Sequence, residues 1–111
     1  MPRTLPGEVW VVDLGLAAKV RPCVILSDYP ELDELALIVV VPHTTAVRGN
    51  RWELVIPKPF LRAGAFHLQQ IQAVPTVRLE RKLGLLSIGE FQDLKSALVR
   101  LLHLSPVSPA L

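Results

Sequence analysis

The amino-acid sequence predicts a mostly β domain, in which a small barrel of short, mostly antiparallel strands packs against one C-terminal helix. Three observations lead to this fold class. The chain has 111 residues, a length that suits one domain with a single core. Five or six short apolar segments are separated by Pro, Gly and polar residues, as strands are by turns. Near the C-terminal end, one segment has apolar residues at helical spacing.

The predicted strands follow one another with short connections. The first begins after the turn-forming pair Pro6-Gly7. The run over residues 36–41 is apolar without a break, which indicates a strand covered on both faces. Residues 76–80 are expected to form a single helical turn. The predicted strands are residues 8–14, 21–28, 36–42, 52–57 and 65–74, with a short sixth at 82–86.

Residues 88–102 are predicted to form one amphipathic helix on the sheet. Ser87 and Glu90 have the spacing of a capping box, in which each side chain bonds the backbone amide of the other residue. Leu86 and Phe91 are placed as the accompanying hydrophobic staple. The apolar residues that recur at helical spacing are Phe91, Leu94, Leu98, Leu101 and Leu102.

Composition limits the classes of protein to consider. Half of the residues are apolar and the mean hydropathy is +0.40, which suggests apolar surface left over for a partner. The single cysteine, Cys23, lies in an apolar run and is expected to be buried. Residues 1–8 lack the features of a secretory signal, and the longest apolar run is too short to span a membrane. We expect one cytoplasmic domain over residues 1–104 and a flexible tail over 105–111.

Charge is unevenly distributed along the chain, although the net charge is only +2. Residues 28–40 hold four acidic residues and no basic one, whereas residues 41–82 hold seven basic residues against two acidic ones. A basic middle segment is what binding to a polyanion requires. A solvated surface that happens to be basic would give the same pattern.

Motifs for metal or nucleotide chemistry are missing from the sequence. There is no phosphate-binding glycine loop, no pair of cysteines, no HExxH and no GxSxG. His43, His67, His103 and Cys23 do not have the spacing of a zinc site. A metal- or nucleotide-dependent enzyme is therefore unsupported, while acid–base chemistry by Arg, Thr, His or Gln remains open.

Several short motifs occur in a specific order. Residues 6–14 read PGEVWVVDL and residues 21–27 read RPCVILS, and these are followed by VVPHTT at 40–45, LQQI at 68–71 and RLERKLG at 78–84. Together with the capped helix, their order and spacing resemble those of the MazF/PemK/Kid family, the toxins of type II toxin–antitoxin systems. The resemblance covers roughly residues 6–104.

The resemblance implies an SH3-like barrel of the MazF/Kid/CcdB type that forms a homodimer. It also implies an endoribonuclease that cuts single-stranded mRNA at short sequences without a metal ion or other cofactor. In such enzymes a ribose 2′-hydroxyl attacks the adjacent phosphorus and leaves a 2′,3′-cyclic phosphate. A cognate antitoxin, expected to be a separate acidic chain, would lie across the basic groove that takes RNA.

The resemblance also suggests which side chains act. Arg21 falls on the family's catalytic arginine, whose guanidinium would hold the phosphate as negative charge develops. Thr44 falls on the catalytic threonine, and Gln70 on a glutamine beside the site. Each also has an ordinary structural interpretation: an exposed cation at a strand start, a hydroxyl bonding local backbone, and a polar residue on an edge strand.

Further candidates for contact with RNA are Thr45 and the loop that follows it. Arg48 and Arg51 would meet phosphates, and Trp52 beside them is a candidate for stacking on a nucleobase, although most strand tryptophans are core or interface residues.

His43 is a candidate proton acceptor. Because neighbours on a strand point to opposite faces, it is not expected to share the face of Thr44.

The sequence departs from the family pattern at residues 72–75. They read QAVP where part of the family has R-[TS]-[IV]-D, and the arginine and aspartate of that motif are catalytic there. The loop at 15–20 also lacks the acidic or histidine residue that some relatives carry. One alternative is therefore a weak or inactive member that binds RNA, or binds a protein as the CcdB-type relatives bind gyrase. A further alternative is a structural subunit that acts only by association.

Overall fold

The computed structural model describes residues 3–15, 17 and 19–104. Within these residues, no helix is both long enough and apolar enough to cross a membrane. The tail expected over residues 105–111 lies outside the described part of the chain, as do residues 16 and 18 of the first loop.

The described residues form seven strands and one C-terminal helix, which confirms the mostly β fold class. In chain order the elements are β1 (Glu8–Asp13), β2 (Val20–Ile25), β3 (Leu37–Thr44), β4 (Glu53–Leu54), β5 (Ala65–His67), the 3-10 turn η1 (Leu68–Gln70), β6 (Gln72–Pro75), the 3-10 turn η2 (Thr76–Arg78), β7 (Leu79–Leu85) and α1 (Ile88–Leu102).

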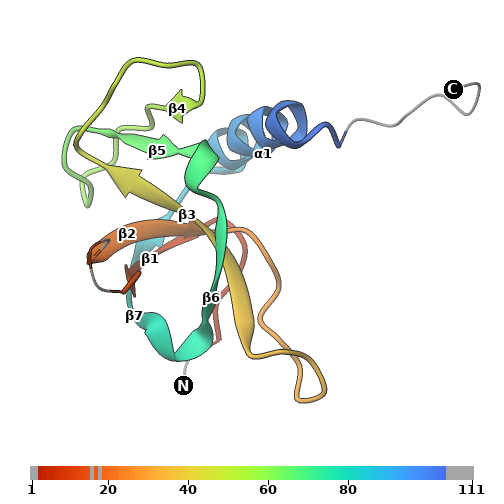
Figure 1. Cartoon of the computed structure of the whole chain (residues 1–111). Coiled ribbons are helices and arrows are strands. Elements are labelled where there is room, and N and C mark those ends of the chain that lie inside the picture. Colours follow the sequence, from red (N-terminus) through yellow and green to blue (C-terminus); the bar gives the residue numbers. More distant parts are fainter. Residues whose placement is uncertain (1–2, 16, 18, 105–111) are drawn as a thin grey trace, which may run out of the picture.

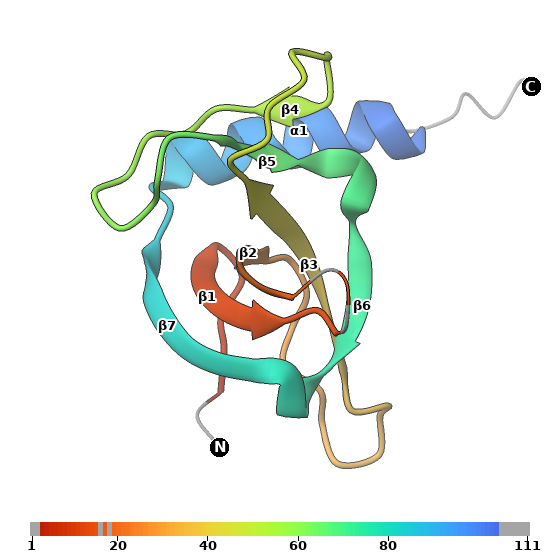
Figure 2. The same ribbon diagram turned by 60° about the vertical axis from the view of Figure 1, so that its left-hand side comes forward.

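The strands pair antiparallel in the order β4-β5-β3-β2-β1-β7, and β6 adds to β3. β6, η2 and β7 curve around β1, β2 and β3 and close the barrel, while α1 lies across one end of it (Figures 1 and 2). The pairing of β1 with β7 contains two register shifts, and such irregularities bend a strand. The curvature of β7 follows from them.

The sheet formed by β1, β2 and β3 is covered on both faces, as the apolar run in β3 predicts. Val9, Val24 and Val41 belong to the core under α1, together with Leu94 and Leu98 of the helix. Alternate residues of the same strands, including Trp10, Cys23 and Val40, fill the core inside the barrel. The period of two along a strand sends neighbouring side chains to the two cores.

Cys23 is fully buried in the inner core, which confirms the interpretation of the single cysteine as a small hydrophobic residue. Burial raises the pKa of its thiol to about 12, an effect that Arg21 nearby opposes. The thiol therefore stays protonated and unreactive in the folded chain.

The long strand predicted over residues 65–74 is wrong, because η1 divides it into β5 and β6. His43 pairs with Phe66, and Val40 pairs with Gln72. A step of three residues along β3 therefore corresponds to a step of six residues along the segment that pairs with it. The three extra residues form η1. Phe66 and Leu68 belong to the core under α1, whereas Val74 belongs to the inner core. The turn allows the chain to pass from one core to the other.

Other strand boundaries also differ from those predicted. β4 spans two residues rather than the predicted 52–57, since Pro57 and Pro59 have no amide to continue a ladder and Val55 is exposed. β3 reaches Thr44, two residues beyond its predicted end, because β5 extends its pairing. The single turn expected after residue 75 is confirmed as η2.

The helix begins and ends as the sequence predicts. Ser87 Oγ accepts the amide of Glu90 at 3.1 Å, and Glu90 Oε1 accepts the amide of Ser87 at 2.8 Å. Lys58 Nζ lies 2.6 Å from the same Glu90 oxygen and ties the β4–β5 connection to the helix. The bond from Lys58 is the main cause of the lowered pKa of Glu90.

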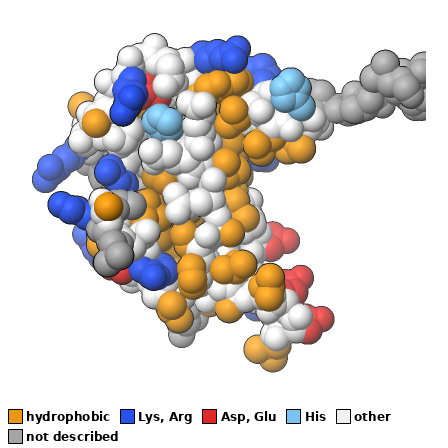
Figure 3. Space-filling view, viewed as in Figure 1, with side chains coloured by type: hydrophobic (Ala, Val, Ile, Leu, Met, Phe, Trp, Pro, Cys, Tyr) orange, Lys and Arg blue, Asp and Glu red, His pale blue; other side chains and the backbone are white. Residues whose placement is uncertain are grey.

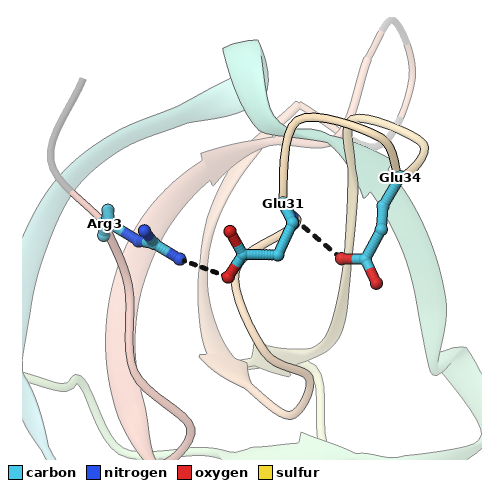
Figure 4. Close-up of polar contacts among 3 residues, drawn as sticks. All are labelled: Arg3, Glu31 and Glu34. Atoms are coloured by element: carbon cyan, nitrogen blue, oxygen red, sulfur yellow. Dashed lines mark hydrogen bonds and ion pairs between the residues drawn. The ribbon is translucent and has the colours of Figure 1, made fainter.

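The acidic turn between β2 and β3 is held by one ion pair and one hydrogen bond (Figure 4). Arg3 Nη2 lies 3.3 Å from Glu31 Oε1, and the amide of Glu31 donates to Glu34 Oε1 at 2.8 Å. The ion pair is largely exposed, so its contribution to stability is small. Its structural effect is to keep the N-terminal segment beside this turn.

The capping box gives a stability prediction. Replacing Ser87 with Ala removes the acceptor for one helix amide and should lower the free energy of unfolding by about 1 kcal/mol. Ser96→Ala is the matched control, because Ser96 is exposed inside the same helix, where Ala is the better helix former. Urea denaturation checks both variants, and an equal loss of stability in the two would contradict the role assigned to the cap.

Candidate functional site

A cavity of about 360 Å³ lies beside the first residues of β2 and the last residues of β3. Three arginines line it: Arg21 from β2, Arg62 from the β4–β5 connection and Arg81 from β7. No Asp or Glu is among the described residues of its wall. Three guanidinium groups around one hollow suit a ligand that carries phosphate. The full lining is Val11, Val20, Arg21, Pro22, His43, Thr45, Phe60, Arg62, Arg81 and Leu83.

The surface shows the same separation of charge. In Figure 3, Lys and Arg side chains gather at the left, around the connection between β1 and β2, and at the top, whereas most of the visible Asp and Glu side chains lie at the lower right over the β2–β3 connection. The acidic and basic segments seen in the sequence thus lie on different sides of this face. A polyanion is attracted to one side and repelled from the other.

Arg21 lies near the start of β2, and Thr44 is the last residue of the neighbouring strand β3. The pairing of β2 with β3 ends at Cys23 and Pro42, two residues short of Arg21 and Thr44, and there β3 pairs with β5 instead. Arg21 and Thr44 are both partly exposed.

The hydroxyls of the two threonines are placed differently. Thr44 Oγ1 accepts the amide of Ala46 at 3.0 Å, which is the local backbone bond expected of a threonine at a loop start. Thr44 is not among the residues that line the cavity, whereas the exposed Thr45 is. The arginine-lined hollow therefore contains the second threonine of the pair.

His43 lines this cavity together with Arg21 and Thr45. Its side chain is 4% exposed and meets the ring of Phe66 edge-on, with 5.1 Å between ring centres. Burial lowers the pKa of His43 below its ordinary value of 6.5, so the imidazole is neutral at neutral pH. A neutral imidazole beside an arginine is able to accept a proton while the arginine holds an anion.

Arg62 and Arg81 are site residues that the sequence motifs did not single out. Both belong to the basic middle segment, which was the available signal; Arg81 lies in the RLERKLG motif without having been named as a site residue, and Arg62 lies outside every motif. Antiparallel pairing of β7 with β1 sets Arg81 opposite Val11, and Val11 itself lines the cavity. Strand pairing, rather than sequence proximity, assembles the cationic wall.

Gln70 lies apart from the residues that line the cavity. It is the last residue of η1 and is exposed, and its carbonyl oxygen accepts the side-chain amide of Gln72 at 3.1 Å. Pro75, at the end of β6, is exposed as well. The segment that departs from the family pattern thus begins two residues after Gln70 and pairs with the first half of β3.

Arg51 and Trp52 lie at a second location, beside the C-terminal end of α1. The guanidinium carbon of Arg51 is 4.7 Å from the centre of the Trp52 ring. Both residues line a cavity with Arg100, Leu101 and His103, and neither lines the one that contains Arg21. The RNA-contact candidates from the sequence are therefore divided between two places.

The residues between Thr45 and Trp52 connect these two places. Arg48 is exposed in this connection, and its backbone amide donates to Glu53 Oε2 at 2.8 Å.

Among the described residues, no group of three or more His, Cys, Asp and Glu side chains comes together as a metal site would require.

Residues 5–102 match the family described as PemK-like, MazF-like toxin of type II toxin-antitoxin system. The chain belongs to this family. The resemblance inferred from the motifs is thereby confirmed, and so is the fold that it implied, since the chain shares the architecture of the family's solved structures.

The MazF-family relatives include curated and solved proteins. The chain is 32% identical over 84 residues to the probable endoribonuclease MazF5 of Mycobacterium tuberculosis, a match over 73% of this chain and 76% of that protein. It has a TM-score of 0.75 and 22% identity to an endoribonuclease from a mycobacterial species, covering 96% and 98% of the two chains.

Two further solved structures contain an antitoxin. One is a MazE–MazF structure from Deinococcus radiodurans, with a TM-score of 0.76, 18% identity and coverage of 94% and 100%. The other is a mycobacterial endoribonuclease in complex with its cognate antitoxin, with a TM-score of 0.75, 23% identity and coverage of 95% and 99%. At this identity the likeness shows the shared fold.

Gly64 gives a prediction about the support of the site in this MazF-family chain. A Cβ at Gly64 would lie 2.8 Å from His43 Cε1 and would overlap the carbonyl oxygen of Thr44. Gly64→Ala should therefore lower the free energy of unfolding by about 1–3 kcal/mol and displace the end of β3. Gly89→Ala, where a Cβ meets open space, is the matched control. Urea denaturation measures both, and a neutral Gly64→Ala would show that the contact is not tight.

Proposed function

We propose that this chain is an endoribonuclease toxin that cuts single-stranded mRNA at short sequences without a metal ion or other cofactor. The family of the chain and the named activity of its curated relative support ribonuclease activity. The observation that carries the proposal is the cavity lined by Arg21, Arg62 and Arg81, because its cations can do what a metal would otherwise do for phosphate.

Arg21 and Thr44 are the catalytic residues of this proposal. Arg21 binds two oxygens of the scissile phosphate and stabilises the charge that develops on them. Thr44 Oγ1 orients the phosphate or relays a proton. Thr44 directly precedes Thr45, which lines the cavity together with Arg21, and Arg62 and Arg81 add positive charge there.

His43 is the proton acceptor that we propose for the attacking ribose. A neutral imidazole takes the 2′-hydroxyl proton, and the 2′-oxygen forms a bond to phosphorus. The bond from phosphorus to the 5′-oxygen breaks, that oxygen takes a proton from water, and the resulting hydroxide takes the proton back from the imidazolium of His43. The products are a 2′,3′-cyclic phosphate and a 5′-hydroxyl end. His43 thus provides a base in a chain that has Gln72 and Pro75 in place of the family's arginine and aspartate.

The remaining candidate contacts extend over the surface. We propose that Thr45, Gln70, Arg48, Arg51 and Trp52 bind RNA around the reacting phosphate. The active form in this proposal is a cytoplasmic homodimer, and its cognate antitoxin lies across the basic groove. The solved relatives that contain antitoxins support a cognate antitoxin as the partner.

Metal-free cleavage is tested with a mixed-sequence RNA in EDTA. Wild-type protein should cut it, and Arg21→Ala should reduce the rate by about 100-fold or more, since a charged transition-state contact is lost. Arg3→Ala is the control, because Arg3 is an exposed arginine outside this cavity. Expression of the wild-type chain alone should arrest growth. If the affinity for RNA falls steeply with rising salt concentration but the RNA stays intact, the non-catalytic binding module is favoured instead.

The role of His43 is tested by the pH dependence of cleavage. Because its pKa is lowered, the imidazole becomes protonated only below pH 6.5, so the acid limb of the rate profile should lie below that value. His43→Gln should remove this limb, and added imidazole should partly restore cleavage by His43→Ala. A profile that keeps its acid limb in His43→Gln would assign the base to another group. Circular dichroism of each variant controls for folding.

A further inference from the structure

A second cavity, of about 460 Å³, lies where the β3–β4 connection meets the end of α1. Arg51 and Trp52 form one wall, and Arg100, Leu101 and His103 from the end of the helix form the other. β4 lies beside α1 in both ribbon views (Figures 1 and 2). No Asp or Glu is among the described residues that line this cavity, and it shares no lining residue with the cavity around Arg21.

The wall from the β3–β4 connection is a flat cationic platform. The guanidinium of Arg51 lies over the ring of Trp52 at 4.7 Å, within the range of a cation–π contact. Trp52 is half-buried, because its ring also packs on the core under α1, while Arg51 is exposed. A planar guanidinium held on an indole presents a surface on which a nucleobase can stack.

The loop that carries this platform is fixed by its own hydrogen bonds. The carboxylate of Glu53 accepts the backbone amides of Arg48, Gly49 and Asn50, and the amide of Trp52 donates to Asn50 Oδ1 at 2.9 Å. These amide bonds, led by that of Arg48, lower the pKa of Glu53 and keep it charged at neutral pH. A loop ordered before binding loses little conformational entropy when a ligand arrives.

The wall from α1 supplies a cation and an apolar floor. Arg100 is exposed in the last turn of the helix, where the helix dipole favours a cation. The helix ends at His103, whose left-handed backbone (φ 56°, ψ 47°) redirects the chain. Arg100 and Leu101 therefore line the same cavity as Arg51 and Trp52.

We infer that this cavity is a subsite for one nucleotide of single-stranded RNA outside the scissile step. The base stacks on the Arg51–Trp52 platform, and its phosphate lies between Arg51 and Arg100. This inference rests on the proposed function, because it extends the RNA path from the cavity around Arg21. A flat aromatic platform favours RNA over an acidic peptide, whose carboxylates would use the arginines but not the ring.

The subsite is tested by binding with mixed-sequence oligonucleotides whose 2′-hydroxyls are all methylated, since these cannot undergo 2′-hydroxyl attack. Fluorescence anisotropy compares a nine-nucleotide probe with a trinucleotide. The double variant Arg51→Ala/Arg100→Ala should weaken binding of the longer probe by roughly tenfold and leave the trinucleotide unchanged. The slope of log affinity against log salt should flatten by about 0.7 for each cation that contacts phosphate.

Matched variants separate the subsite from general loss of charge. Arg3→Ala should leave binding of both probes unchanged, because Arg3 lines neither cavity. The longer probe should quench the intrinsic fluorescence of wild-type protein, and Trp52→Phe should remove the quenching, because the other tryptophan, Trp10, is buried. Unchanged affinity for the longer probe in the double variant overturns the inference. Displacement of that probe by a short polyglutamate peptide at equal concentration overturns it as well.

Cleavage of unmodified RNA distinguishes the subsite from the proposed function. If the double variant binds the longer probe as wild type does while both proteins cut RNA, the function stands and the subsite fails. If the wild type never cuts RNA but the double variant loses length-dependent binding, the subsite stands and the ribonuclease proposal fails.

Discussion

The antiparallel pairing of β3 with β2 is the interaction on which the rest of the structure depends. β3 is paired along both edges, by β2 on one side and by β6 and then β5 on the other. Its side chains also enter the cores on both faces of the sheet. A strand held in this way cannot slip by one residue without moving apolar groups into the wrong core. The end of β3, which carries His43 and Thr44, therefore has little freedom to move.

The cationic wall depends on the same topology. Arg62 reaches the hollow from the β4–β5 connection, and Arg81 reaches it from β7, the strand that pairs with β1. Guanidinium groups in one cavity repel each other, so the bound state is favoured by an anion that neutralises them. The fold thus gathers like charges around one hollow, where a polyanionic ligand is attracted. The acidic turn near Glu31, lying on a different side, leaves the field around them positive.

The sequence predicted the elements whose cause is local. The capping box at Ser87, the doubly covered β3 and the turn after Pro75 follow from short patterns, and the structure confirms them. The division of the predicted strand 65–74 at η1 could not be predicted from a short pattern. It arises because the pairing of β3 with β5 and the pairing of β3 with β6 are out of register with each other. Arg21 and Thr44 were identified by family motifs, whereas Arg62 joins the site through a loop without any motif. Contacts made by tertiary pairing leave no pattern in neighbouring residues.

Because Cys23 is buried, its reactivity reports how often the folded chain opens at β2. A thiol with a pKa of about 12 and no exposed surface reacts with alkylating reagents only after β2 separates from β1 and β3. Since the chain has one cysteine, every labelling event records an opening of the strand that carries Arg21. The rate of labelling under native conditions therefore gives the frequency with which this strand is released, without any introduced probe.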